Sequence, residues 1–207
     1  MKITAIAPSH NRPGRYWLSV DNKPLGYVTA EEIFELGLAL GRAMTKQTYS
    51  KLVNRITYNQ HYFAATAYAD RRLRSKAEVK HYLRRRGCAL DNTNAIIQKL
   101  EQLGIIDETK LADAFVHDAL TLKPLSSRML ALKLKTKQLD PKVIKQSISA
   151  VGYDDNTALE QLVRQKQARY AGEQDRFFRY LLRQGFAYSD IVKAIGKPEF
   201  RRRPPVR

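Results

Sequence analysis

The chain reads SKAEVKHYLRRRG from Ser75 to Gly87, and this stretch has the marks of one complete helix. Ser75 followed by Glu78 is the pattern of a capping box, in which both side chains bond free N–H groups at a helix start. Val79 and Leu83 stand one turn apart and would form an apolar face. Gly87 supplies the left-handed conformation with which helices commonly end. The stretch therefore predicts an amphipathic helix whose apolar face packs on a core.

The same pattern returns twice further along the chain. Its apolar pairs recur at Val79 and Leu83, at Leu130 and Leu134, and at Phe177 and Leu181. The helix that follows each pair aligns as well, through Ile96, Ile144 and Ile191. Self-similarity at regular intervals indicates a repeat architecture. The sequence predicts three-helix repeats over residues 58–106, 107–153 and 154–196.

The first part of the chain, residues 1–57, has a different pattern. Short apolar or alternating runs separated by turn residues indicate strands. The expected strands are Lys2–Ala7, Tyr16–Val20 and Leu25–Val28. Thr29 with Glu32 forms a second capping box, so a helix should begin there. This segment is predicted to be a small antiparallel sheet with a short helix.

A single three-helix unit leaves an apolar stripe that it cannot cover alone, so neighbouring repeats should stack and share apolar surface. The predicted fold is therefore mainly α, with tandem three-helix repeats in an elongated, curved array after the β segment. Residues 197–207 are rich in Arg and Pro and are expected to form a basic flexible tail. The protein is expected to be a monomer.

Further helix ends are indicated by local chemistry. Asp140 before Pro141 is an N-cap followed by a first-turn proline. The other expected N-caps are Asp91, Asp107, Asp155 and Ser189. Gln138 stands where the other repeats have a glycine, so a left-handed conformation there would be strained unless that helix ends differently.

The chain is strongly basic, with 37 Lys and Arg against 20 Asp and Glu in 207 residues and a net charge of +17. This is well above the net charge of about 2 to 8 that keeps a small domain soluble. The excess extends along the whole sequence rather than lying in one tail. A field of one sign favours a polyanionic partner such as nucleic acid or a nucleoprotein.

Candidate binding residues are the cations of the equivalent helices in the three repeats. Lys76, Lys80 and Arg84 recur every four residues, which places them on one helix face. The full candidate set is Arg71, Arg72, Arg74, Lys76, Lys80, Arg84, Arg85, Lys133, Lys137, Arg176, Arg179 and Arg183. Tyr82 and Tyr180 lie among these cations and could stack on bases, but tyrosines so placed more often pack in a core.

The sequence argues against an enzyme, a metal site or a cofactor. Cys88 is the one cysteine; it excludes a cysteine-based zinc site, suggests a reducing compartment, and aligns with apolar core positions. The histidines lack metal-ligand spacing, and no glycine-rich phosphate loop occurs. The carboxylates near Asp107 could hold Mg²⁺, but helix capping explains them better. Without a long apolar run or a signal peptide, we expect a cytoplasmic protein that does not contact the membrane.

Several of the stretches just described resemble the RecX family of recombinase regulators. They are ADRRLRS at 69–75, GIIDE at 104–108, AFVHD at 114–118 with LKP at 122–124, and RYLLRQGF at 179–186. Many members have two aspartates where this chain has Asp107 and Glu108. The strand-rich start also resembles the extra N-terminal segment of longer members.

The resemblance implies a non-enzymatic protein that binds the groove of the RecA filament on DNA and bridges its protomers. Such binding would restrain, and most simply inhibit, RecA ATP hydrolysis and strand exchange in homologous recombination, DNA repair and the SOS response. Contact with single- or double-stranded DNA is implied as well. The alternative is a direct DNA-binding module in which helix pairs act like helix-turn-helix units.

Overall fold

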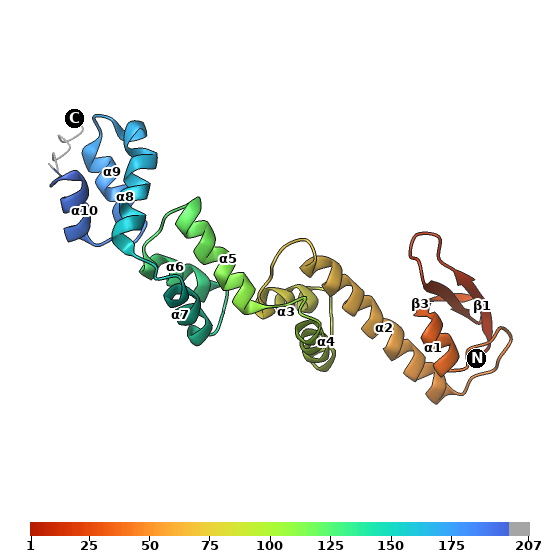
Figure 1. The fold of residues 1–207 in the computed structure, drawn as a ribbon. Coiled ribbons are helices and arrows are strands. Elements are labelled where there is room, and N and C mark those ends of the chain that lie inside the picture. The colour runs from red at the N-terminus through yellow and green to blue at the C-terminus, as the bar shows by residue number, and fades with distance from the viewer. Residues whose placement is uncertain (199–207) are drawn as a thin grey trace, which may run out of the picture. The chain divides into compact units, whose positions relative to one another are not determined.

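The computed structural model describes residues 1–198 and is mainly helical, with a small sheet near the N-terminus (Figure 1). This confirms the predicted class, a mainly α chain that follows a small antiparallel β segment. The chain divides into two compact units. The first contains residues 1–72 and 79–106, and the second contains residues 73–78 and the chain from residue 107 onward. The predicted tail lies, from residue 199 on, outside the described residues.

The sheet is antiparallel, with its strands in chain order. Its members are β1 (Ile3–Pro8), β2 (Arg15–Val20) and β3 (Lys23–Thr29). Asp21 and Asn22 join β2 to β3 with φ angles of 48° and 60°. Positive φ at two central residues suits a tight hairpin, because the twist of such a turn matches that of the strands. Leu18 of β2 and Val28 of β3 are buried in the core of this segment, with 0% and 1% exposure.

Two helices follow the sheet, α1 (Ala30–Glu35) and α2 (Lys46–Ala69). The first half of α2 packs Leu52 and Ile56 against the sheet. Its second half contributes Ala65 to the first helical core. One continuous helix thus serves both cores, and it passes through the boundary that the sequence suggested at residue 57.

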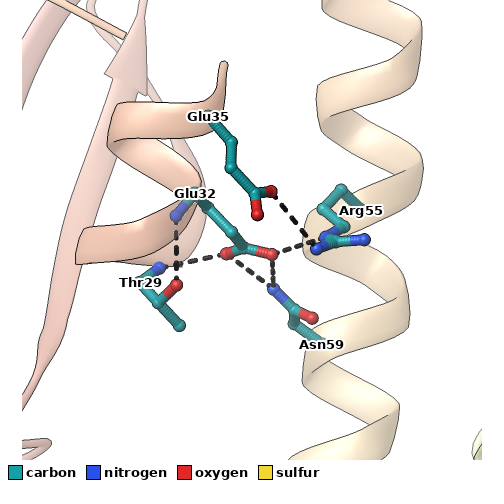
Figure 2. Close-up of polar contacts among 5 residues, drawn as sticks. All are labelled: Thr29, Glu32, Glu35, Arg55 and Asn59. Atoms are coloured by element: carbon teal, nitrogen blue, oxygen red, sulfur yellow. Dashed lines mark hydrogen bonds and ion pairs between the residues drawn. The ribbon is translucent and has the colours of Figure 1, made fainter. Parts of the chain in front are cut away.

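A buried carboxylate joins α1 to α2 (Figure 2). Glu32 is 4% exposed. Its carboxylate accepts hydrogen bonds from Thr29 N at 3.0 Å, Arg55 Nε at 2.6 Å and Asn59 Nδ2 at 2.7 Å. Burial by itself would raise the pKa of Glu32, but these hydrogen bonds outweigh it and hold the pKa below 4.5. The predicted capping box is present and is also the point at which α2 is attached.

The remaining helices form the repeats, each with its own apolar core. They are α3 (Lys76–Arg85), α4 (Leu90–Gln102), α5 (Glu108–Thr121), α6 (Ser127–Thr136), α7 (Pro141–Ala150), α8 (Asp155–Lys166), η1 (Gln167–Tyr170), α9 (Gln174–Arg183) and α10 (Tyr188–Ile195). The six aligned apolar residues of α3, α6 and α9 are all buried, with at most 5% exposure. Cys88 is buried in the first of these cores, as predicted.

Several predicted helix caps are present. Ser75 Oγ accepts from Glu78 N at 3.2 Å, and Glu78 Oε2 accepts from Ser75 N at 3.0 Å, which completes the capping box of α3. Asp140 caps α7, with Pro141 in its first turn. Asp107 caps α5 by accepting from Lys110 N at 2.9 Å. Local sequence chemistry was sufficient at these helix starts.

The predictions of N-caps at Asp91 and Ser189 are wrong. Helices α4 and α10 begin earlier, after Ala89 and Ala187, and neither alanine offers a side-chain cap. Asp91 and Ser189 consequently lie inside the first turn. A carboxylate in a first turn can still interact favourably with the helix dipole.

Gln138 ends α6 in the left-handed conformation, with φ of 59°. Helix α6 therefore ends with the same backbone conformation as the helices that end at a glycine, although Gln138 carries a side chain. A left-handed conformation costs a residue with a Cβ about 1 kcal/mol. Leu139, the next residue, is 4% exposed, so burial of its side chain offsets part of this cost.

Consecutive repeats are joined by the same contact in two places, both within the second unit. Glu108 Oε1 accepts from Lys76 N, the first N–H of α3, at 3.1 Å. Asp155 accepts from Ser127 N, the first N–H of α6, at 2.6 Å and from Ser127 Oγ at 3.1 Å. The N-cap of α8 is Asp154, so the prediction that Asp155 caps this helix is wrong. In both places a serine N-cap bonds an N–H further along the first turn, and a carboxylate from the following repeat satisfies the first N–H of the helix.

We predict that Glu32→Gln lowers the free energy of unfolding by about 1–2 kcal/mol at neutral pH, because hydrogen bonds to a charged acceptor are lost. A carboxyl whose pKa is lowered on folding stabilises the protein above its ordinary pKa of 4.5, and this stabilisation disappears as the pH falls through the lowered value. The difference between the two proteins should therefore shrink below pH 4.5. Urea unfolding across a pH series measures it.

The matched control is Glu35→Gln. Glu35 lies on the same helix, its side chain is 63% exposed, and its carboxylate is 3.8 Å from Arg55. An exposed ion pair of this kind contributes little to stability. Equal losses for the two variants would contradict the role assigned to Glu32.

We also predict that Gly185→Ala destabilises the chain more than Gly152→Ala. Both glycines have positive φ, 92° and 57°, so both variants bear backbone strain, and the strain is larger at Gly185 because its φ lies outside the left-handed region open to residues with a Cβ. A Cβ at Gly152 would meet nothing within 4 Å, whereas one at Gly185 would lie 2.8 Å from Met129 Cβ. The additional loss should be at least about 1 kcal/mol, because α6 must move. Thermal unfolding followed by circular dichroism tests this, and similar losses would show that the packing at Gly185 is loose.

Candidate functional site

Helix α3 separates its apolar and cationic residues clearly. Val79 and Leu83 are fully buried. Lys76, Lys80 and Arg84 are exposed, as the spacing predicted. Arg85 is exposed as well, and so are Arg71 and Arg72 just before the helix. The helix thus presents a cationic face held in place by its own apolar face.

Two of the candidate cations have a packing role. Arg74 Nη1 and Lys137 Nζ lie 3.5 Å and 3.4 Å from the same oxygen, Glu78 Oε1. Their side chains are only 11% and 22% exposed. Lys137 Nζ also lies 5.3 Å from the centre of the Phe115 ring. These two cations are therefore held by α3, α5 and α6 and are poorly placed to meet a partner.

Glu78 is the centre of this cluster. Burial raises the pKa of Glu78, but the hydrogen bond from Ser75 and the charges of Lys137 and Arg74 outweigh it, so the pKa lies below its usual value. The carboxylate is ionised at neutral pH and attracts both cations. The sequence identified Glu78 as part of a capping box but carried no sign of its contact with Lys137, which lies 59 residues away.

The α9 cations lie together beside acidic residues. Arg176, Arg179 and Arg183 line a shallow hollow of about 650 Å³ with Glu173 and Asp175. Arg176 Nη1 is 2.8 Å from Glu173 Oε2, and Arg179 Nε donates to the Asp175 carbonyl oxygen at 3.2 Å. The arginines remain exposed and could meet an anion. On the equivalent helix α6, Lys133 is exposed.

The tyrosines near these cations pack in the cores, which is the more common of the two arrangements that the sequence allowed. Tyr82 stacks on Tyr68 with ring centres 4.1 Å apart and an interplanar angle of 1°. Tyr180 packs on Tyr170 at 5.5 Å in the core of the third repeat. Burial raises the pKa of Tyr180. Neither ring is arranged as an open platform for a base.

An apolar groove that the sequence did not reveal lies within the second unit. It has a volume of about 1160 Å³ and is lined by residues of α6, α7, α9 and α10. Leu132, Leu182 and Tyr188 line it and are 53%, 38% and 47% exposed. In the sequence, Leu132 stands between the core residues Leu130 and Leu134. A leucine that lies off the buried face of its helix was the only sign of this groove that the sequence offered.

Residues 1–198 contain no group of three or more His, Cys, Asp or Glu side chains that could hold a metal ion. Within the same residues, none of the helices combines the length and the apolar character needed to cross a bilayer.

Comparison with known proteins gives a consistent result. No protein-family model matches the chain. The protein "Regulatory protein RecX" of Streptococcus gordonii is 24% identical over 198 residues, which cover 94% of this chain and 76% of the relative. Its namesake from Clostridium botulinum is 22% identical over 204 residues, or 95% of both chains.

Solved structures share the fold. A crystal structure of regulatory protein RecX superposes with a TM-score of 0.71 at 17% identity and covers 94% of this chain and 98% of its own. RecX from Lactobacillus salivarius superposes with a TM-score of 0.56 at 24% identity and covers 67% of this chain and 94% of its own. The chain is thus similar to RecX proteins along almost its whole sequence, and it shares the fold of the solved RecX structures.

Proposed function

We propose that the chain regulates a RecA-type recombinase by binding the filament that the recombinase forms on DNA. Binding in the filament groove restrains ATP hydrolysis and strand exchange. The protein acts through adhesion, as a cytoplasmic monomer, and uses no cofactor and no catalytic chemistry of its own. The names of its relatives as regulatory proteins support this proposal.

The observation that carries the proposal is the exposure of cations on the equivalent helices of successive repeats. Lys80 and Arg84 on α3, Lys133 on α6, and Arg179 and Arg183 on α9 are all exposed. Several modest contacts that act together can exceed the affinity of any one of them by a large factor. A basic chain that offers its contacts repeat by repeat suits a polymeric, anionic partner.

The structure orders the candidate residues by their availability. Arg74 and Lys137 are bound to Glu78, and the backbone N–H of Lys76 is bound to Glu108. A reversed charge at residue 76 would bring a second carboxylate close to Glu108. Lys80 and Arg84 are therefore the best positions for a test.

The primary test measures RecA ATP hydrolysis and strand exchange on single-stranded DNA as the protein is added. Both rates should fall as the filament becomes saturated. Unchanged rates at demonstrated saturation would contradict the proposal. A rise in both rates would show that the chain assists the recombinase, since the sign depends on which filament state is bound more tightly.

For the cationic face, we predict that Lys80→Glu with Arg84→Glu weakens filament binding at least about tenfold. If both residues meet phosphates, the slope of the logarithm of affinity against that of salt concentration should also decrease by about 2. The matched control is Lys46→Glu with Lys51→Glu, an equal change of charge at two exposed positions of α2. Fluorescence anisotropy on labelled filaments measures binding, and circular dichroism checks helicity. Equal weakening by both pairs would assign the effect to net charge alone.

The same proteins distinguish the alternative of direct DNA reading. On DNA without recombinase, phosphate-driven binding should fall steeply as salt rises and should show no sequence preference. Tight binding to one duplex sequence in the absence of RecA would favour the helix-turn-helix alternative and overturn the proposal.

A further inference from the structure

The apolar groove of the second unit has the composition of a docking site. Its floor and walls include Leu132, Ile144, Ile148, Leu182, Phe186 and Tyr188. Ile144 and Phe186 are buried, whereas three of the others are at least 38% exposed. Each square ångström of apolar surface removed from water contributes about 25 cal/mol, so covering these side chains would be favourable. The exposed apolar side chains are gathered in one concave place, which is where a ligand can cover them together.

The charges that line the groove are almost all positive. Arg128 and Lys135 of α6 and Lys145 of α7 line it and are exposed. Among the described residues, none of the three is paired with a carboxylate. Asp155, the one acid in the lining, is bound to Ser127 N and Oγ. The occupant that complements this lining carries apolar side chains for the floor and free carboxylates for the rim.

Two other occupants fit less well. A second copy of the chain would bring another +17 charge to a basic groove. A nucleic acid would complement the cations, but bases stack on aromatic platforms, and Tyr188 is the only exposed aromatic side chain in a mostly aliphatic lining.

We propose that this groove binds an acidic amphipathic peptide segment of a protein partner. Leucine-like side chains of the segment enter between Leu132 and Leu182, and its Asp or Glu side chains meet Arg128, Lys135 and Lys145. The inference goes beyond the proposed function, because it concerns contact with protein and needs neither DNA nor a filament.

The test uses the full chain and a fluorescein-labelled peptide in which Glu and Leu alternate with helical periodicity. Fluorescence anisotropy should show saturable binding of this peptide. A second peptide with every Glu replaced by Lys should not bind, since its charges repel the rim. Absence of binding by the acidic peptide, or equal binding by both peptides, would overturn the proposal.

Variants locate the site. Leu132→Glu and Lys145→Glu should each weaken binding of the acidic peptide about tenfold or more, because each puts a carboxylate into the groove. The matched controls are Leu122→Glu, at a side chain that is 64% exposed outside the groove, and Lys166→Glu at the end of α8. Both controls should bind as the unmodified chain does. Equal losses in controls and groove variants would contradict this location.

Two further measurements test whether a second copy of the chain or a nucleic acid occupies the groove instead. Sedimentation would reveal a concentration-dependent dimer, and a dimer abolished by Leu132→Glu would assign the groove to a second copy. A labelled single-stranded oligonucleotide whose binding is weakened by Leu132→Glu and which the acidic peptide does not displace would assign it to nucleic acid. Either result would overturn the peptide proposal, and neither depends on whether the chain inhibits a recombinase.

Discussion

The first N–H groups of α3 and α6 need acceptors, and the structure takes those acceptors from the following repeat. Glu108 and Asp155 fill this role, each at the first residue of its own helix. The start of one helix therefore depends on the placement of another that comes much later in the chain. In α6 this contact adds to the packing of the apolar face through Leu130 and Leu134, and both hold the helix that carries Lys133.

Folding uses part of the positive charge of the chain. Arg55 bonds to the buried Glu32, and Arg74 and Lys137 pair with Glu78. In both clusters, hydrogen bonds and cations hold the pKa of the carboxyl below its usual value despite burial. These acids stay charged at neutral pH and neutralise cations that would otherwise repel one another within the fold. The cations that remain exposed on α3, α6 and α9 are those available to an anionic partner.

Much of the fold could be predicted because its signals are local. A capping box joins residues three positions apart, and an apolar face repeats every turn, so Ser75, Glu78, Val79 and Leu83 lie as expected. Some predicted N-caps were wrong because the same type of side chain can also stand one or two residues inside the helix. An aspartate within a first turn resembles an N-cap in sequence, which explains the errors at Asp91 and Asp155.

The sequence by itself determined the helical class, the repeat, the buried apolar positions and the excess of positive charge. Each of these follows from residue type and short-range spacing. Only the tertiary structure decided which cations pair with carboxylates, which acids join the repeats, and that Leu132 faces an open groove rather than a core. Those outcomes depend on distances between residues far apart in the chain, such as Glu78 and Lys137, and packing alone sets such distances.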